Sequence, residues 1–467
     1  MHAAETLIRS MDPVMSIAAA GSVPQPETFR LYRNVPQLLR DPMGEVERIG
    51  RAAAGQVARL HFGVAHVYLA THPDHVQHIL MDNAANFLRD GTYWRPLRRL
   101  FGQGIMSEGT DWKLSRKALQ PVLTRRYVHS MADQMTAAIN ESLDGLAESA
   151  RTGRPVVAMT ELSRIVSHTV ISVFFGGKIT PADAARLTPA FETVVKAIAF
   201  RYLLPFLPFW IPVPGDRALR RAVRLFDEVL YPLIREQRWR NDDVRDFFSV
   251  LCRAHEADGG QVSDRWVRDN LFAMFATSTE TTIGALTWLW PLLNDHPEVA
   301  RKLQEEVDTV VGAGPVRTEH VPGLTYTRQV VQELLRLYPA GWVFPRRAVQ
   351  STRLGGVTIQ AGESVAISPF LTHRLESFWE RPGEFDPDRF DPDLGREPGH
   401  HRYAYVPFGD GPHKCIGLHV FNLEAELIIA SILSRFRPTS CTSVSRIPRV
   451  GATLRPKESV KLILKVA

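Results

Sequence analysis

One cysteine, Cys415, lies in a glycine-rich segment, residues 408–417, directly before an apolar stretch that predicts a helix. Glycine lets the backbone turn tightly and approach a large, flat group closely. A cysteine at the start of a helix meets backbone N–H groups and the positive end of the helix dipole, and both favour thiolate over thiol. His413 and Lys414 add positive charge nearby. A thiolate held in this way is a good axial ligand for iron.

Two other interpretations of Cys415 stay open at this point. A lone cysteine in a turn is most often a buried structural residue. His413 and Cys415 are also close enough in sequence to bind zinc together. Zinc sites normally need four protein ligands at motif spacing, or three with a water molecule, and we find no further ligands at such spacing. We therefore rank a haem iron ahead of both alternatives.

A second unusual segment is a run of six polar residues, 277–282, inside a long apolar stretch with helical periodicity. Threonine and serine are mediocre helix formers, and their hydroxyls can bond to a carbonyl one turn earlier and bend the helix. Six consecutive residues cover the whole circumference of a helix, so some of them must point inward. A local rule broken in a buried helix often marks a functional site, so this run predicts one.

Charged and aromatic residues also occur in pairs at helical spacing. Glu333 and Arg336 lie three apart among apolar neighbours, which favours a partly buried ion pair over an exposed one. A buried pair needs further partners, and Arg389 is a candidate. Trp112 and Arg116, four apart, share a face of another predicted helix. The plain alternative there is an aromatic ring resting on an arginine stem.

Apolar periodicity predicts the elements that must position these residues. We expect a β-hairpin over 59–71 and paired strands over 354–367, around Gly362. Helical periodicity dominates 120–312, interrupted by an aromatic loop over 200–214. Separate helices are expected around 112–116, over 263–294 with the polar run, over 298–311, around 333–336, and over 418–436, where the helix should be buried. The expected fold class is mainly α with a smaller β part.

The composition is that of an ordinary globular protein, with 467 residues, 45% hydrophobic and 23% charged. We expect a flexible tail over 1–28 and a single catalytic domain over 29–467, because no linker or repeat divides the chain. The net charge of +6 suits an acidic protein partner and does not indicate nucleic acid. Three scattered cysteines favour the cytoplasm, and no apolar run has the length of a transmembrane segment.

The spaced pattern Phe408, Gly411, His413, Cys415, Gly417 resembles the cysteine-loop signature of the cytochrome P450 family. The resemblance implies the cytochrome P450 fold, with haem b (iron protoporphyrin IX) buried between the long helix that carries the polar run and the helix after Cys415. It implies that Cys415 is the proximal thiolate and the metal ligand. It also implies that Phe408 stacks near the haem and that His413 bonds a haem propionate.

Other motifs follow in the family's order along the chain. Trp112 and Arg116 resemble a helix motif that binds one haem propionate, and Arg346 resembles a second propionate-binding arginine. Glu280 and Thr281 resemble the acid–alcohol pair of oxygen activation. In that reading Thr281 bonds iron-bound dioxygen and Glu280 helps to relay protons.

The chain departs from the family pattern at Thr277 and Ser278, where alanine or glycine and then glycine are usual. The set Glu333, Arg336 and Arg389 resembles the family's structural lock beneath the haem, which holds the fold and takes no part in catalysis.

The resemblance implies a monooxygenase that inserts one oxygen atom from O₂ into a lipophilic small molecule, with a terpenoid favoured over a fatty acid or polyketide. Electrons are expected from a ferredoxin and a ferredoxin reductase, and the enzyme is expected to be a monomer. Two alternatives remain. One is a peroxide-driven or redox-neutral haem-thiolate enzyme, which the residues at 277 and 278 motivate, and the other is a non-catalytic haem sensor.

Family topology also indicates which segments face the substrate and the redox partner. The expected lining of the substrate pocket is apolar and aromatic, as suits a lipophilic substrate. It comprises residues 87–106, 200–210, 272–276, 341–344 and 450–453. Basic residues near Cys415 are expected to dock an acidic ferredoxin, namely Lys117, Arg125, Arg126 and Lys414.

Overall fold

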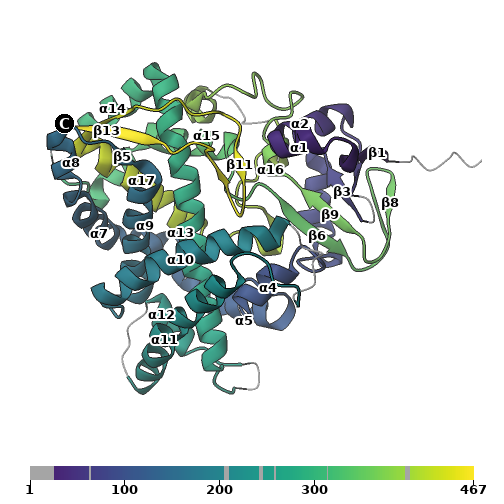
Figure 1. Ribbon diagram of the computed structural model, residues 1–467, viewed down its shortest axis with the longest axis horizontal. Coiled ribbons are helices and arrows are strands. Elements are labelled where there is room, and N and C mark those ends of the chain that lie inside the picture. The colour runs from purple at the N-terminus through teal and green to yellow at the C-terminus, as the bar shows by residue number, and fades with distance from the viewer. Residues whose placement is uncertain are drawn as a thin grey trace, which may run out of the picture.

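The computed structural model describes residues 26–62, 65–203, 210–240, 246–256, 259–312, 314–394 and 400–467. Most of the tail expected over 1–28 lies outside the described residues, and Glu27–Arg30 form strand β1. Helices occupy most of the molecule, and the strands of the largest sheet gather at one side (Figure 1). The mainly α fold class predicted from the sequence is therefore confirmed.

The helices follow the predicted order closely from residue 109 onward. They are α1 (Val35–Arg40), α2 (Pro42–Ala52), α3 (Pro73–Gln77), α4 (Arg95–Phe101), α5 (Gly109–Leu119), α6 (Arg125–His129), α7 (Ala132–Asp144), α8 (Ala147–Thr152), α9 (Ala158–Phe175), α10 (Pro181–Leu203), α11 (Asp216–Trp239), α12 (Phe247–Cys252), α13 (Asp264–Asp295), α14 (Pro297–Val310), α15 (Thr325–Leu337), α16 (Pro369–Thr372) and α17 (Leu418–Arg435). Within the described residues, none of them combines the length and apolar composition of a membrane span.

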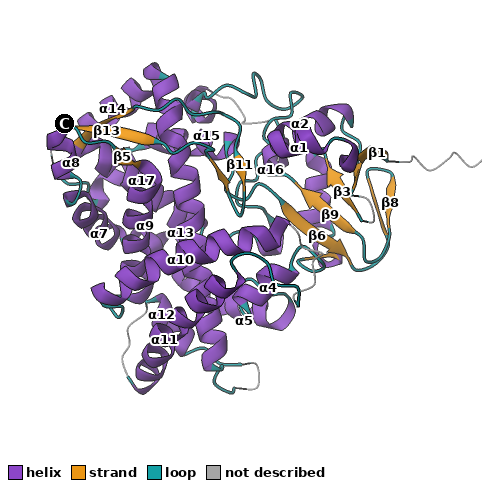
Figure 2. Cartoon of the chain, viewed as in Figure 1, coloured by secondary structure: helices purple, strands orange, loops and turns teal. Residues whose placement is uncertain are grey.

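The strands form one larger sheet and smaller ones (Figure 2). They are β1 (Glu27–Arg30), β2 (Ala58–His61), β3 (His66–Ala70), β4 (Phe87–Leu88), β5 (Val156–Val157), β6 (Phe344–Ala348), β7 (Thr352–Leu354), β8 (Val357–Ile359), β9 (Ser364–Ile367), β10 (Phe436–Ser440), β11 (Arg449–Val450), β12 (Leu454–Arg455) and β13 (Lys461–Val466). The larger sheet has the order β1-β2-β3-β9-β6-β4, the second β10-β13-β5, and two hairpins pair β7 with β8 and β11 with β12.

The sheet confirms one strand prediction and corrects another. β2 and β3 pair antiparallel, as the predicted hairpin requires. The strands on either side of Gly362, β8 and β9, do not pair with each other. β8 pairs with β7, whereas β9 pairs with β3 and β6, because the turn at Gly362 carries the chain from the hairpin into the larger sheet.

Helix α13 runs through the centre of the molecule and carries the polar run. Ser263 caps its start, since the Ser263 hydroxyl accepts a hydrogen bond from the Trp266 N–H at 3.1 Å. The helix ends at Asp295, two residues before Pro297 opens α14. Both ends agree with the predicted helix to within a residue.

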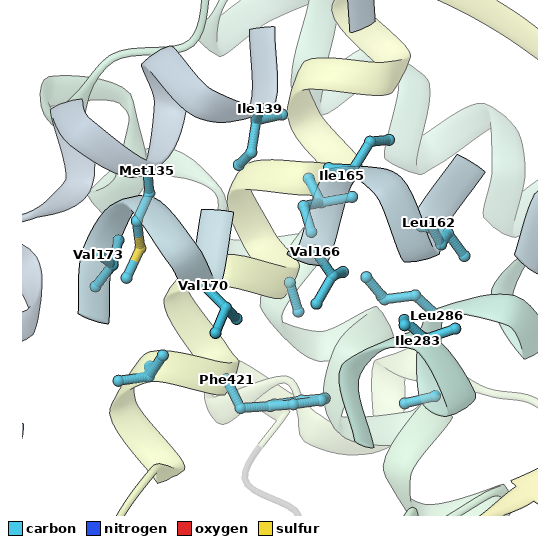
Figure 3. Packing of buried hydrophobic residues seen from close by; sticks show 14 of the residues in the cluster. Met135, Ile139, Leu162, Ile165, Val166, Val170, Val173, Ile283, Leu286 and Phe421 are labelled. Carbon is cyan, nitrogen blue, oxygen red and sulfur yellow. The ribbon is translucent and has the colours of Figure 1, made fainter. Parts of the chain in front are cut away.

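The core around α13 is built by apolar residues from helices far apart in the sequence. Side chains of α7, α9, α13 and α17 meet there, including those labelled in Figure 3. Ile283 and Leu286 of α13 face Val166 of α9 and Phe421 of α17, and each is buried. Burying such a side chain stabilises the fold by about 1.5–3 kcal/mol. Helix α17 is apolar around most of its circumference, so it is buried as predicted.

Two segments differ from the sequence-based expectation. Residues 95–101 form the short helix α4, which the sequence analysis did not predict. The aromatic loop was expected from residue 200, but α10 continues to Leu203, and 204–209 lie outside the described residues. After them, Trp210 is 82% exposed.

Candidate active site

Cys415 lies in the turn between the 3-10 helix Gly411–His413 and α17, where the glycine-rich segment predicts it. Its backbone N–H donates to the Phe408 carbonyl at 2.9 Å, which closes the turn. The Phe408 ring packs against the Phe421 ring of α17, with centroids 5.5 Å apart. The side chain of Cys415 is exposed although protein surrounds it on most sides.

The surroundings of the sulfur act on its pKa in opposite directions. Burial raises the pKa of the Cys415 thiol, and this is the larger effect. The N–H groups of Gly417 and Leu418 and the charge of Arg116 lower the pKa without cancelling the rise. The start of α17 therefore does not by itself produce a thiolate, contrary to the argument from sequence. A coordinated metal ion would deprotonate the thiol.

One glycine in this turn is required by a close approach of two backbones. Gly411 has φ of +69°, a left-handed conformation that favours glycine. A Cβ atom at this position would overlap the carbonyl oxygen of Leu80. Any other residue would therefore push the Cys415 turn away from residues 78–82.

Helix α5 brings Trp112 and Arg116 to the Cys415 turn, as their spacing predicts. Arg116 donates from Nη1 to the Lys414 carbonyl at 2.6 Å. The Trp112 ring lies 4.2 Å from the His413 ring, centroid to centroid. His413 Nε2 lies 3.1 Å from Glu108 Oε1, while its Nδ1 is buried and has no partner among the described residues.

Two buried arginines, Arg89 and Arg346, lie in the same region. Burial lowers the pKa of each to about 10. Arg346 is 7% exposed, and its Nη1 donates to the neighbouring carbonyl of Pro345 at 2.9 Å rather than to an acid. Arg89 donates to the Ser107 carbonyl at 2.6 Å and has Glu108 as its acidic neighbour.

This cluster carries more positive than negative charge. Arg89, Arg346 and His413 share Glu108 as an acidic neighbour, whereas Arg116 donates to the Lys414 carbonyl. Burial disfavours the charge of Glu108, but hydrogen bonds from His413 and the Arg89 N–H outweigh it and lower its pKa to about 2. Buried cations without acids are costly. The two propionates of a haem, with Cys415 as the sulfur ligand, would balance this cluster, so the residues fit haem b.

Two threonine hydroxyls of the polar run, those of Thr277 and Thr281, bond to carbonyls of α13 itself. Thr277 Oγ1 donates to the Ala273 carbonyl at 2.8 Å, and Thr281 Oγ1 donates to the Thr277 carbonyl at 2.7 Å. These bonds to the preceding turn satisfy the hydroxyls inside an apolar helix. Thr281 is half-buried.

Glu280 does not contact Thr281 but points to the C-terminal hairpin. Thr453 Oγ1 donates to Glu280 Oε1 at 2.7 Å, and the Arg455 guanidinium pairs with Oε2. Burial raises the pKa of the Glu280 carboxyl, and Arg455 and Thr453 oppose that rise. Sequence reasoning missed both partners. The sequence analysis placed Thr453 only in the expected lining of the substrate pocket and gave Arg455 no role.

Comparison with known proteins identifies the family. The family model described as Cytochrome P450 matches residues 23–464, nearly the whole chain. The chain belongs to the cytochrome P450 family. Members of this family bind haem b and act as monooxygenases, so the resemblance of the cysteine loop is confirmed at the level of the family.

Similar proteins include enzymes named for terpenoid chemistry. Pentalenene oxygenase of Streptomyces avermitilis is 29% identical over 86% of this chain and 88% of its own length. Cyclooctatin synthase of Streptomyces melanosporofaciens is 31% identical over 86% of this chain and 88% of its own. Among solved structures, the cytochrome P450DA heme domain superposes with a TM-score of 0.81 at 23% identity. The match covers 95% of this chain and 98% of the solved structure, and it supports the fold.

This P450 contains a second buried acid beside α13 that the sequence analysis did not single out. Glu424 of α17 is 1% exposed and accepts one hydrogen bond, from Thr282 Oγ1 at 3.1 Å. Its other oxygen has no partner among the described residues. Burial raises the pKa of Glu424 to about 8. The signal in the sequence was a pair of acidic residues, Glu424 and Glu426, within a largely apolar helix.

The expected lock of Glu333, Arg336 and Arg389 is assembled in this P450. Arg336 donates to Glu333 at 2.7 and 2.8 Å, and its remaining donors reach three backbone carbonyls, those of His373, Pro382 and Glu384. The Asp386 N–H donates to Glu333 at 2.9 Å, and Arg389 Nε lies 3.5 Å from it. Glu333 and Arg336 are fully buried.

The structure thus brings most of the predicted site residues together. Trp112, Arg116, Arg346, His413 and Phe408 surround or adjoin the Cys415 turn. Glu280 and Thr281 lie on α13, but the Glu280 carboxylate is turned to Arg455. The individual roles of these residues stay predictions.

Proposed function

We propose that this P450 hydroxylates a lipophilic small molecule, and that its substrate is a terpenoid. The balanced reaction is RH + O₂ + 2 H⁺ + 2 e⁻ → ROH + H₂O. Bound haem b supplies the oxygen binding and the redox chemistry. The observation that carries the proposal is the Cys415 turn beside a buried cluster of cations whose charge Glu108 balances only in part.

The residues around the turn have separate roles in this proposal. Cys415 is the sulfur ligand of the iron, and Phe408 packs beside it and limits the access of water. The propionates would be held by Arg346 and His413 and by Arg116 together with Trp112, because charged hydrogen bonds to carboxylates are strong and directional.

Thr281 and Glu280 would supply protons. The Thr281 hydroxyl now donates to a helix carbonyl, and rotation of its side chain would free that proton for transfer at Oγ1. Glu280 would supply a new proton to Thr281 Oγ1 after its carboxyl group separates from Arg455. The ion pair with Arg455 therefore controls when Glu280 can act as an acid. This places both residues in the reaction without contact between them in the resting arrangement.

The substrate class is inferred from apolar segments near α13 and from the names of related enzymes. The Phe101 ring of α4 meets Phe272 of α13 at 5.8 Å, and Trp342 donates to the Gly451 carbonyl at 3.0 Å. Thr453 reaches Glu280 on α13. Two of the segments expected to line the pocket, 87–106 and 450–453, therefore contact α13, and a third, 341–344, contacts the second of them. Two relatives are named pentalenene oxygenase and cyclooctatin synthase, which favours a terpenoid.

Electrons would come from a ferredoxin and a ferredoxin reductase. Arg125, Arg126 and Lys117 are exposed on α5 and α6, near the start of α17, where an acidic ferredoxin would approach the Cys415 side. We also propose that the enzyme works as a cytoplasmic monomer, as the scattered cysteines favour. Gel filtration of the haem-loaded protein tests the oligomeric state.

The iron ligand is tested by Cys415→Ala, with Cys441→Ala as the matched control because Cys441 is exposed elsewhere in the fold. The first change should abolish the thiolate-type carbon monoxide difference spectrum and the second should leave it intact. An unchanged spectrum in Cys415→Ala would refute the ligand assignment.

The proton role is tested by Thr281→Ala, with Thr287→Ala as the control. Thr287 also donates to a carbonyl one turn earlier, at 2.6 Å, but lies beyond the polar run. Oxygen consumption should continue without product in Thr281→Ala only. Equal coupling in both variants would remove Thr281 from the proposal.

The substrate is tested by titrating the ferric protein with terpene hydrocarbons, fatty acids and polyketide lactones. Terpenes should shift the spin state at the lowest concentrations, and a stronger response to fatty acids would overturn the substrate class.

A peroxide-driven enzyme is the second candidate, because Thr277 and Ser278 depart from the family pattern. It predicts product with peroxide and none with ferredoxin, reductase and reduced nicotinamide cofactor.

A further inference from the structure

The turn between α4 and α5, residues 102–107, is fastened to α13 by the buried side-chain amide of Asn270. This side chain is fully buried, and its Oδ1 accepts a hydrogen bond from the Ile105 N–H at 2.9 Å. Its Nδ2 donates to the Trp266 carbonyl at 2.9 Å, one turn earlier on the helix. Because both ends of the amide are used, its orientation is fixed.

Two glycines bring the backbone of this turn against α13. Gly102 and Gly104 have φ of +62° and +146°, in the region that favours glycine. A Cβ atom at Gly104 would lie 2.8 Å from the Asn270 amide. A Cβ atom at Gly102 would overlap the carboxyl group of Asp269, which accepts the Gln103 N–H at 2.9 Å. The position of the turn therefore depends on the side chains of the helix.

The same turn orients a buried cation on its other side. Arg89 donates from Nη1 to the Ile105 carbonyl at 3.3 Å and from Nη2 to the Ser107 carbonyl at 2.6 Å. Its Nε is buried and has no hydrogen-bond partner among the described residues, and Glu108 Oε2 lies 3.8 Å from it. The orientation of the Arg89 guanidinium group therefore depends on two backbone carbonyls of the turn.

Ile105 joins the helix to this cation, since its N–H binds α13 and its carbonyl binds Arg89. Arg89 belongs to the cation cluster beside the Cys415 turn, which two haem propionates would balance. Its guanidinium carbon lies 5.8 Å from the centroid of the Trp112 ring, and the His413 ring lies 4.2 Å from that same ring. A displacement of Ile105 would therefore move a positive charge relative to the bound haem.

We propose that Asn270 is a positioning residue for bound haem b. By holding Ile105 it fixes the Arg89 guanidinium group, and the fixed charge raises the reduction potential of the haem iron. A nearby cation favours the ferrous form, because that form carries one positive charge less than the ferric form. The inference requires haem at the Cys415 turn. It depends neither on the substrate nor on the hydroxylation, so either proposal can fail alone.

A purely structural role for Asn270 is the alternative, and Thr287 provides the matched control. Thr287 is also buried on α13, and its Oγ1 donates to the Ile283 carbonyl at 2.6 Å, so its bond stays within the helix. The variant Thr287→Val should lower the free energy of unfolding and leave the reduction potential as it is in the parent.

The test measures the reduction potential of the haem-loaded full chain by spectroelectrochemical titration. Arg89→Gln should shift the equilibrium towards the ferric form by about tenfold, which is about 59 mV for one electron. Asn270→Leu removes the acceptor of the Ile105 N–H, so the guanidinium group is held less firmly. It should shift the equilibrium in the same direction by about threefold, or about 28 mV.

The double variant Arg89→Gln/Asn270→Leu tests the route from the helix to the haem. If Asn270 acts through Arg89, the double variant should have the potential of Arg89→Gln alone, because the effects of coupled residues do not add. Carbon monoxide spectra of every variant establish that the thiolate ligand is retained. A wrong assignment of Cys415 would appear already in the spectrum of the parent protein.

Four results would overturn the proposal. They are an unchanged potential in Asn270→Leu, an unchanged potential in Arg89→Gln, full additivity in the double variant, and an equal shift in Thr287→Val. If Asn270→Leu does not take up haem, Asn270→Ala removes the same acceptor without adding bulk and should give the same shift. Loss of haem uptake in both variants would make Asn270 a structural residue and would also overturn the proposal.

Discussion

Two regions of this P450 each bury a glutamate of a helix, and the two glutamates have opposite kinds of partner. At the lock beneath the Cys415 turn, Glu333 accepts hydrogen bonds from Arg336 and the Asp386 N–H, and Arg389 lies near. Beside α13, Glu424 has one hydroxyl as a partner, and no cation faces it among the described residues. Both carboxyls are almost fully enclosed.

The different partners give the two glutamates different roles, because Glu333 stabilises the fold whereas Glu424 can hold a proton. A buried charge with all of its partners in place fixes the arrangement of the segments that supply them. A buried acid without a cation is neutral instead, because burial disfavours its ionised form. Glu280 is intermediate, since its charge is balanced by Arg455, which is itself partly accessible. Glu424, which is neutral, and Glu280, which is balanced by an accessible arginine, are therefore the acids next to α13 that are available for proton chemistry.

The largest effect is expected at the lock. Glu333→Gln removes the charge that balances Arg336, which would remain buried with a net charge. Breaking such a pair costs about 3–5 kcal/mol. Urea unfolding of the haem-loaded protein measures this loss. Arg381→Gln, which removes an exposed charge near the same segments, is the control. A loss under 1 kcal/mol for Glu333→Gln would mean that the lock does not hold the fold.

The second largest effect is a pH dependence of the unfolding free energy that arises from Glu424. Its pKa is about 8 in the folded protein and near 4.5 in the unfolded chain, so the unfolded state releases its proton first as pH rises. The neutral Glu424 carboxyl therefore stabilises the folded state fully below about pH 4.5, and this stabilisation is lost as pH rises to about 8. Between these two pH values the free energy of unfolding falls by up to about 1.4 kcal/mol per pH unit. Glu424→Gln should flatten this fall in unfolding free energy.

Glu426→Gln is the control for that change, because Glu426 lies on the same helix but pairs with Arg328 at 3.1 Å. Its variant should keep the fall of stability with pH. If Glu424→Gln also keeps it, Glu424 is ionised in the folded state and the comparison between the two regions fails.

A smaller effect is expected at Arg455. Arg455→Met removes the cation beside Glu280, so the pKa of the Glu280 carboxyl should rise further. The pH dependence of product yield per oxygen consumed should move upward by about one unit. Lys457→Met, an exposed charge on the following segment, is the control. An unmoved profile would exclude Glu280 from the proton supply.

The smallest effect is expected at an exposed pair. Arg301→Gln breaks an ion pair with Glu305 one helical turn away, which contributes about 0.3–0.5 kcal/mol. Urea unfolding should detect little change at moderate salt. A loss comparable with that of Glu333→Gln would show that burial is not what distinguishes the lock.

Several parts of this protein could be predicted from local sequence alone. The limits of α13 follow from Ser263 and Pro297, and the Cys415 turn follows from its glycines, because these residues act on the backbone next to them. Glu333 and Arg336 meet because they share one helix face. The helix α4 was missed, since its seven residues around Pro96 are too few to show a clear period.

Partners distant in the chain could not be predicted in this way. Glu280 and Arg455 are 175 residues apart, and Thr282 and Glu424 are 142 apart. Nothing near either acid indicates whether a cation will face it. The pairing of β9 with β3 and β6, in place of β8, was missed for the same reason.

The sequence by itself determined the family, the helices and the cysteine turn, because backbone preferences and helical spacing act over a few residues. Only the tertiary structure decided which buried acids are charged and which are neutral. That depends on whether packing brings a cation or only a hydroxyl to each carboxylate.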